Sequence, residues 1–156
     1  MLGVIGRRAA RPALRPGTAE PGQVRDLRAR AVFDVVVDIR VGSPTFGQWD
    51  SVLLDDTEHR TIYLSEGLGH GFLALQDNST VMYLCSAEYN PQREHTICAT
   101  DPALGIDWPL VDGAPPTLSD RDAAAPSLDD VRASGLLPTW EETNAFVEGL
   151  RAKPAN

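Results

Sequence analysis

The stretch that decides the fold class of this chain is FDVVVDIR, residues 33–40. The apolar side chains of Phe33, Val35, Val37 and Ile39 alternate with the four residues between and after them. An alternation with a period of two is typical of a half-buried β-strand. We therefore predict a strand that places one face in a core.

Further strand candidates follow this stretch at short and regular intervals. The intervening residues are rich in Gly, Pro, Asp, Asn and Ser, which favour turns. No alternation of strands with helices supports a doubly wound parallel sheet. The pattern therefore predicts a mainly β protein, an antiparallel sandwich or barrel. The candidates are residues 46–54, 61–64, 72–75 and 80–85, with a glycine-punctuated loop at 67–71.

The last thirty residues have helical patterns instead. The segments 127–130 and 139–142 are capping boxes, and Gly135 stands at a helix stop position. We predict a helical C-terminal part over residues 127–156, following a proline-rich excursion over 101–116. Its amphipathic last helix is expected to bury four apolar side chains, those of Trp140, Phe146, Val147 and Leu150.

Charge divides the chain of 156 residues into two unequal parts. Residues 1–31 contain seven of the arginines and only two acidic residues, whereas the whole chain has a net charge of −8. The acidic balance argues against a protein that follows nucleic-acid phosphates, and no apolar run is long enough for a membrane span. Cys85 and Cys98 show no paired spacing, so we expect reduced thiols in a cytoplasmic protein.

Residues 1–31 show no sustained period and contain two Pro-Gly pairs. The composition leaves three alternatives: a transit peptide, a basic arm that binds nucleic acid, and a flexible tail. The flexible tail is the simplest interpretation. The change at residue 31 predicts three units: an irregular segment 1–31, a β domain 32–126 and the helical part 127–156.

Candidate site residues are few. His59, His70 and His95 have no metal-ligand spacing, so no metal site is expected. His70 stands between Gly69 and Gly71, which allow the backbone to pass close to another group while the imidazole points outward. For Tyr83, a core tyrosine is the favoured interpretation and a general acid is the alternative.

Several motifs together resemble one known family, the dTDP-4-dehydrorhamnose 3,5-epimerases, which are metal-free jelly rolls of the cupin type. The similar residues span about 32–140. The motifs are FDVVVDIR at 33–40, GSPTFG at 42–47, Glu66-Gly67 with His70-Gly71-Phe72, Tyr83, Tyr89, Asp101-Pro102 and GIDWP at 105–109.

The resemblance implies an incomplete cupin-like jelly roll that acts on dTDP-4-dehydro-6-deoxyglucose without a metal or cofactor. It implies that Tyr83 is the general acid and that Asp122 orients a basic histidine. Tyr89 corresponds to the residue that stacks on thymine. His70, Glu94 and Arg121 correspond to contacts with the nucleotide sugar. The family is homodimeric, and the sequence leaves open whether this chain is.

The chain departs from the family before Phe33. The family's catalytic histidine lies there in an Arg-Gly-Leu-His stretch, followed by a lysine, whereas this chain has no histidine before His59 and no lysine except Lys153. We therefore expect residues 1–31 to be mis-started or out of frame, and any epimerase activity to be impaired. The alternatives are a non-catalytic module that binds dTDP-sugars and a chain with no function.

Overall fold

The computed structural model describes residues 4–7, 23–29, 31–85, 94–110 and 113–152. Strands predominate in this part of the chain, which confirms the prediction of a mainly β fold. The strands are β1 (Val4–Arg7), β2 (Gln23–Ala29), β3 (Ala31–Asp38), β4 (Trp49–Asp55), β5 (Thr61–Leu64), β6 (Leu68–Ala74), β7 (Thr80–Leu84) and β8 (Glu94–Ile97). The helices are α1 (Asp120–Ala123), α2 (Leu128–Ala133) and α3 (Trp140–Arg151).

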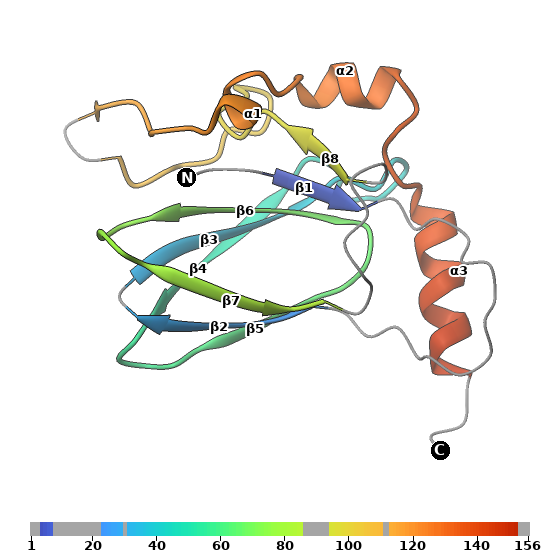
Figure 1. Cartoon of the computed structure of the whole chain (residues 1–156). Coiled ribbons are helices and arrows are strands. Elements are labelled where there is room, and N and C mark those ends of the chain that lie inside the picture. The colour runs from blue at the N-terminus through green and yellow to red at the C-terminus, as the bar shows by residue number, and fades with distance from the viewer. Residues whose placement is uncertain (1–3, 8–22, 30, 86–93, 111–112, 153–156) are drawn as a thin grey trace.

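The strands form two three-stranded sheets and one strand pair, all antiparallel. One sheet has the order β4-β3-β6 and the other β5-β2-β7, while β1 pairs with β8. Strand β1 also lies beside β6, and β2 lies near β4. In Figure 1 the two sheets form layers, with α1 and α2 above β8 and α3 beside one end of the strands.

Strand β3 is buried on both of its faces, where the sequence predicted burial of one. Its odd-numbered residues, among them Val35 and Val37, join a core cluster with residues of the C-terminal part. Its even-numbered residue Val32 belongs to a second cluster that reaches the other sheet through Ile62 and Val81. Asp34 is also buried, so the polar positions of the alternation face the space between the sheets instead of solvent.

The predicted strands differ from the observed ones mainly at their ends. Phe46 belongs to a turn, and β4 begins only at Trp49. Strand β6 begins at Leu68, four residues earlier than predicted, because Gly69 and Gly71 pair with Val37 and Val35 of β3. From Leu68 on, the glycine-rich stretch is therefore part of the sheet, and only Gly67 remains in a turn.

Residues 1–31 contain two of the strands, which differs from the expectation of an irregular segment. Strand β2 is the central strand of its sheet, paired with β5 on one side and β7 on the other. Both partners come from later in the chain, so the pairing depends on distant backbone and leaves no clear local period in the sequence.

The helices begin where their caps predict. Ser127 accepts a hydrogen bond from the backbone of α2, and Thr139 forms a complete capping box with Glu142 at the start of α3. Sequence patterns did not predict the short helix α1. The expectation that α3 buries four apolar side chains is wrong: those side chains are half-buried, and Thr143 is the buried residue of the helix.

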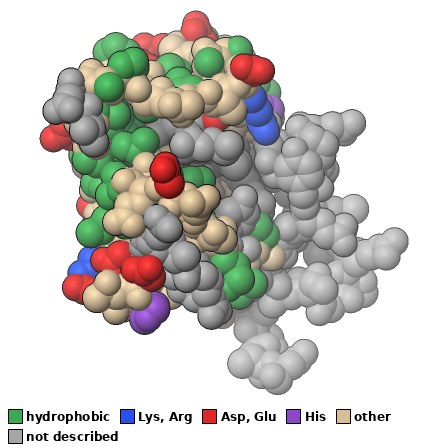
Figure 2. All heavy atoms as spheres, turned by 60° about the vertical axis from the view of Figure 1, so that its left-hand side comes forward, with side chains coloured by type: hydrophobic (Ala, Val, Ile, Leu, Met, Phe, Trp, Pro, Cys, Tyr) green, Lys and Arg blue, Asp and Glu red, His purple; other side chains and the backbone are tan. Residues whose placement is uncertain are grey.

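Acidic side chains are spread over the face shown in Figure 2, and few Lys or Arg side chains appear among them. This agrees with the net charge of −8. Among the described residues, no helix is long and apolar enough to cross a membrane.

Candidate functional site

A histidine and an aspartate form a buried pair between the two sheets. Nε2 of His70 lies 2.8 Å from each carboxylate oxygen of Asp34. The two residues are 4% and 1% exposed, respectively. They come from neighbouring strands, since His70 of β6 pairs with Val36 of β3, two residues from Asp34. An ionic carboxylate on one ring nitrogen fixes the orientation and tautomer of an imidazole.

The histidine therefore has a different environment from the one predicted. The flanking glycines suggested an imidazole pointing outward from a loop, but His70 lies within β6 and its ring is 6.2 Å from that of Phe72. Phe72 packs against the cluster between the sheets. A buried imidazole with a carboxylate partner can hold or move a proton in a site shielded from water.

Tyr83 occupies a backbone position that faces this region from the opposite sheet. It is paired with Arg25, which is paired with Ile62 on the other side, so the three positions form one row across the sheet. Ile62 belongs to the cluster between the sheets. The backbone position of Tyr83 therefore lies in a row that faces Asp34 and His70 across the space between the two sheets.

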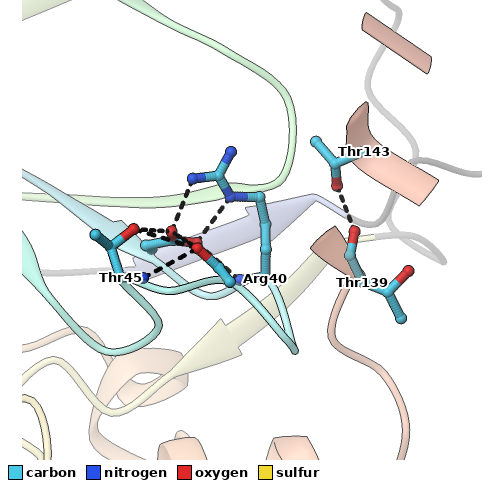
Figure 3. Close-up of polar contacts among 6 residues, drawn as sticks. Arg40, Thr45, Thr139 and Thr143 are labelled. Carbon is cyan, nitrogen blue, oxygen red and sulfur yellow. Dashed lines mark hydrogen bonds and ion pairs between the residues drawn. The ribbon is translucent and has the colours of Figure 1, made fainter. Parts of the chain in front are cut away.

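A second polar group lies at the end of β3, around Asp38. Arg40 Nη2 donates to Asp38 Oδ2 at 2.7 Å, and the hydroxyls of Ser43 and Thr45 each donate to the same oxygen at 2.6 Å. Figure 3 shows Arg40 and Thr45 converging on this carboxylate. Burial raises the pKa of Asp38, but the hydrogen bonds outweigh it and hold the pKa well below its usual range.

This group connects the sheet with helix α3. The guanidinium of Arg40 lies 4.4 Å from the ring centroid of Trp140, and Val41 forms a parallel bridge with Thr139. Thr143 donates to the backbone carbonyl of Thr139 (Figure 3). We interpret the Asp38 group as structural, since its members satisfy one another.

The remaining predicted site residues lie elsewhere or outside the described residues. Asp122 is half-buried and bonds with Ser119, whose hydroxyl donates to Asp122 Oδ2 at 2.7 Å. Arg121 lines a pocket with His95. Tyr89 lies outside the described residues, and so do the side chains of Tyr83 and Glu94.

The structure thus brings together His70 and Asp34 but not His70 and Arg121. The pocket of Arg121 borders the outer core cluster through Val131, whereas His70 lies between the sheets. Sequence analysis missed Asp34, although a carboxylate between the apolar residues of a strand was an available signal. In the described part of the chain, no group of three or more His, Cys, Asp or Glu residues could hold a metal ion.

The comparisons with known sequences and with solved structures agree with one another. The sequence matches the family described as dTDP-4-dehydrorhamnose 3,5-epimerase over residues 22–130. A curated relative, the dTDP-4-dehydrorhamnose 3,5-epimerase of Mycobacterium tuberculosis, is 81% identical over 121 residues, which cover 78% of this chain and 60% of the relative. The chain thus spans about 60% of the length of this relative.

Solved structures show the same likeness. An rmlC epimerase of Mycobacterium tuberculosis matches with a TM-score of 0.78 and 64% identity, over 96% of this chain and 76% of the other. An epimerase from Legionella pneumophila, solved in complex with dTDP-4-keto-L-rhamnose, matches with a TM-score of 0.71 and 43% identity over 76% of this chain and 62% of the other. The two-sheet architecture is therefore the cupin-like jelly roll of these epimerases.

Proposed function

This chain belongs to the dTDP-4-dehydrorhamnose 3,5-epimerase family, and on that premise we propose that it binds a dTDP-linked 4-keto-6-deoxy sugar between its two three-stranded sheets. The observation that carries the proposal is the buried His70–Asp34 pair, which lies in the space that the two sheets enclose. The Legionella relative, solved with dTDP-4-keto-L-rhamnose, supports this class of ligand.

The proposed substrate is dTDP-4-dehydro-6-deoxyglucose, which would be epimerised at C3 and C5. Both carbons are next to the C4 ketone, so their protons can leave through an enolate. The reaction requires a base on one face of the sugar, an acid on the other and a positive group near the enolate oxygen. No electron transfer is needed, so the reaction balances without a redox cofactor.

The family resemblance supplies roles for individual residues. Tyr83 would return a proton to the enolate as general acid, and its place in the row of Ile62 is compatible with a ligand between the sheets. His70, held by Asp34, would contact the nucleotide sugar, as would Tyr89 and Glu94.

The C-terminal residues of the set have weaker support from the geometry. Asp122 would orient the family's basic histidine, but its hydroxyl partner in the structure is Ser119. Arg121 would contact the nucleotide sugar as well. It is the residue that the geometry supports least for this role, because it lies beyond the outer core cluster.

We further propose that these 156 residues turn over the substrate slowly. The family's basic histidine and the lysine beside the enolate have no counterpart before Phe33. Loss of a general base costs about 10²–10⁴ in rate, and loss of one enolate partner about 10²–10³. The two losses need not multiply, since residues that act as one unit are not additive.

Calorimetric titration with dTDP tests binding first. We expect saturable binding to the whole chain, with affinity lowered about 10–100-fold in Asp34→Asn and His70→Gln, because a hydrogen bond to a charged group is worth about 1.5–3 kcal/mol. His59→Gln is the matched control, since His59 is exposed in the loop between β4 and β5. Unchanged dTDP affinity in both pair variants would contradict the proposed location.

Deuterium exchange into the sugar separates an enzyme from a binding module. We expect trace exchange at C3 and C5, abolished in Tyr83→Phe. Binding of dTDP with no exchange at all would favour the alternative, a non-catalytic module that binds dTDP-sugars. Turnover within tenfold of a full-length relative, in a coupled assay with the rhamnose-forming reductase and NADPH, would refute the proposed impairment.

The family resemblance also implies a homodimer, and one feature supports association of two copies. The outer face of sheet β5-β2-β7 exposes Tyr63, Met82 and Leu84, of which Leu84 is 62% exposed. Exposed apolar residues on one sheet face are a common protein-binding surface. Sedimentation equilibrium tests this: we expect Leu84→Lys to shift the chain toward monomer, and an unchanged mass distribution would argue against this face.

A further inference from the structure

Helix α1, which carries Arg121 and Asp122, has no buried residue of its own. It is four residues long and lies beside strand β8 (Figure 1). A helix of this length is not stable without support from the rest of the fold. The positions of its two candidate site residues therefore depend on the segments that precede and follow it.

The segments on both sides of α1 are attached to the fold. Before the helix, Leu118 packs against the outer core cluster. After it, the carbonyl of Pro126 accepts a hydrogen bond from the amide of Cys98 at 2.8 Å. The amide of Leu128 donates to Oδ2 of Asp101 at 2.7 Å. These two bonds hold the chain just beyond the end of α1 against the turn that follows β8.

Asp101 supplies the side chain of this attachment. It is 8% exposed, and its second oxygen, Oδ1, accepts from the amide of Ala103 at 2.9 Å. Each carboxylate oxygen thus accepts one backbone N–H. A buried carboxylate without donors is costly, so the bond to Leu128 is not free to break. The carboxylate therefore joins the turn after β8 to the first residue of α2.

The turn that carries Asp101 is itself held on the core. Ile97 and Ala99 are buried in the outer core cluster. Nε1 of Trp108 donates to the carbonyl of Ala99 at 2.9 Å, and the amide of Asp101 donates to the carbonyl of Cys98 at 3.1 Å. A side chain on a backbone that is fixed in this way can hold a second segment in one position.

We propose that Asp101 is a positioning residue for the nucleotide-sugar site, which acts by holding α1 and, through it, Arg121. The inference rests on the proposed function, in which Arg121 contacts the nucleotide sugar. Asp101 does not line the pocket of Arg121, so its effect is indirect. Asp122 is held by the same attachment, but the basic histidine that it would orient has no counterpart before Phe33. Ligand affinity therefore reports on Arg121.

Hydrogen exchange of the chain without ligand tests whether Asp101 holds α1. Asp101→Asn leaves one oxygen where two amides converge, at almost unchanged volume. The amides of Ala123, Ala124 and Ala125 are expected to exchange about 3–10-fold faster, because local opening of α1 becomes easier. The effect stays below that of a whole hydrogen bond to a charged group, since Leu118 still packs on the core. Unchanged exchange at these amides would overturn the proposal.

Ser127→Ala is the matched control. It removes the cap of α2, in which the hydroxyl of Ser127 accepts from the amide of Asp130 at 3.1 Å, and it leaves the bond between Asp101 and Leu128. A general loss of stability would appear in both variants, whereas loss of the attachment would appear only in Asp101→Asn. Exchange of the α1 amides in Ser127→Ala should stay within about twofold of the wild-type chain.

Calorimetric titration with dTDP-glucose tests the link to ligand binding. Asp101→Asn is expected to lower the affinity about 3–10-fold in the wild-type background and less than about twofold in the Arg121→Gln background. The second effect is smaller because the contact that Asp101 positions is then already missing. Ser127→Ala should change the affinity less than about twofold. Equal effects of Asp101→Asn in the two backgrounds would show a merely structural role and overturn the proposal.

Two further outcomes keep the causes apart. A wild-type chain that does not bind dTDP-glucose would refute the proposed function, whereas faster exchange at α1 would still support the attachment. Circular dichroism establishes that each variant is folded. If Asp101→Asn does not fold, the wild-type chain provides the test, because coupling between two sites is reciprocal. Bound dTDP-glucose should then slow exchange at the amide of Leu128 more than at that of Thr143 in α3. Equal protection of the two amides would overturn the proposal.

Discussion

The two three-stranded sheets have the same number of strands and the same antiparallel pairing, but they differ in what covers them. Sheet β4-β3-β6 has one core cluster on each face, so its central strand β3 is buried throughout most of its length. Sheet β5-β2-β7 contributes Ile62 and Val81 to the cluster between the sheets. Its side chains Tyr63 and Leu84 are 60% and 62% exposed.

The difference indicates where the stability of the chain resides. Burial of apolar area contributes about 25 cal/mol per Å², so a sheet covered on both faces contributes more than one covered on a single face. Residues that follow β8 in the chain, such as Trp108, Leu128 and Val131, supply the second cover of β3. We therefore expect substitutions around β3 to cost more than substitutions on the outer face of the other sheet.

Removal of the indole of Trp108 is expected to have the largest effect. Its ring makes an edge contact with Phe33 at 5.8 Å, and Nε1 donates to the carbonyl of Ala99 at 2.9 Å. Trp108→Ala should lower the free energy of unfolding by about 3–5 kcal/mol, measured by urea denaturation. Trp108→Phe keeps a ring but loses the hydrogen bond, so a loss close to that of the alanine variant would show that packing on β3 is not the main term.

Gly67 tests how closely the sheet approaches helix α3. Its φ is +81°, and an added Cβ would lie 2.8 Å from Thr143 Oγ1 and 3.0 Å from Arg40 Cδ. Gly67→Ala is expected to cost about 2–4 kcal/mol, from backbone strain together with the clash.

Gly42→Ala is the control for Gly67, because Gly42 has a φ of +87° and nothing within 4 Å of an added Cβ. Strain alone should cost about 1–2 kcal/mol. Equal losses of unfolding free energy in the two variants would mean that the approach to α3 contributes nothing.

The carboxylate of Asp38 is expected to make the free energy of unfolding depend on pH. Because its pKa is lowered in the folded state, its contribution is present above the unfolded-state pKa of about 3.9 and is lost progressively as the pH falls below about 4. Asp38→Asn should cost about 1–3 kcal/mol at pH 7. The difference between the wild-type chain and the variant should narrow at pH 3.

Asp50→Asn provides the reference for that measurement, since Asp50 is exposed and accepts only from the backbone of Ser51 among the described residues. Its effect on the urea midpoint should be small at both pH values. A constant difference between the Asp38 variant and the wild-type chain from pH 7 to pH 3 would contradict the assigned role of the carboxylate.

The smallest effect is expected on the outer face of the other sheet. Tyr63 is 60% exposed, so Tyr63→Thr should change the free energy of unfolding by less than about 0.5 kcal/mol in dilute, monomeric protein. A loss of more than about 2 kcal/mol, as expected for a core substitution, would show that this face is covered. The contrast between the two sheets would then fail.

Much of the fold could be predicted from local patterns. The alternation in residues 33–40, the turn residues between strands and the two capping boxes all correspond to observed elements. The alternation could not show whether the polar face of this strand lies against solvent or against another sheet. Asp34 and Asp38 occupy the positions expected for solvent, yet both are buried, because His70 and Arg40 satisfy their charges.

The candidate site was predictable to a smaller extent. His70 stood out by its glycine neighbours, but its partner Asp34 lies 36 residues away and only the pairing of β3 with β6 brings them together. The His95–Arg121 pocket is equally non-local. Strand β2 escaped prediction for the same reason, since both of its neighbours come later in the chain.

The bridge between Val41 and Thr139 can form only after the ribosome has translated both residues. The amide of Val41 donates to the carbonyl of Pro138, and Trp140 covers the guanidinium of Arg40. Their partners at 138–140 are translated about 100 residues after Arg40, which at roughly 5–20 residues per second is a delay of about 5–20 s. During that interval the nascent chain carries the end of β3 without its hydrogen bond to Pro138, and the guanidinium of Arg40 without the ring of Trp140. Helix α3 therefore stabilises the end of a strand that was synthesised about 100 residues before it.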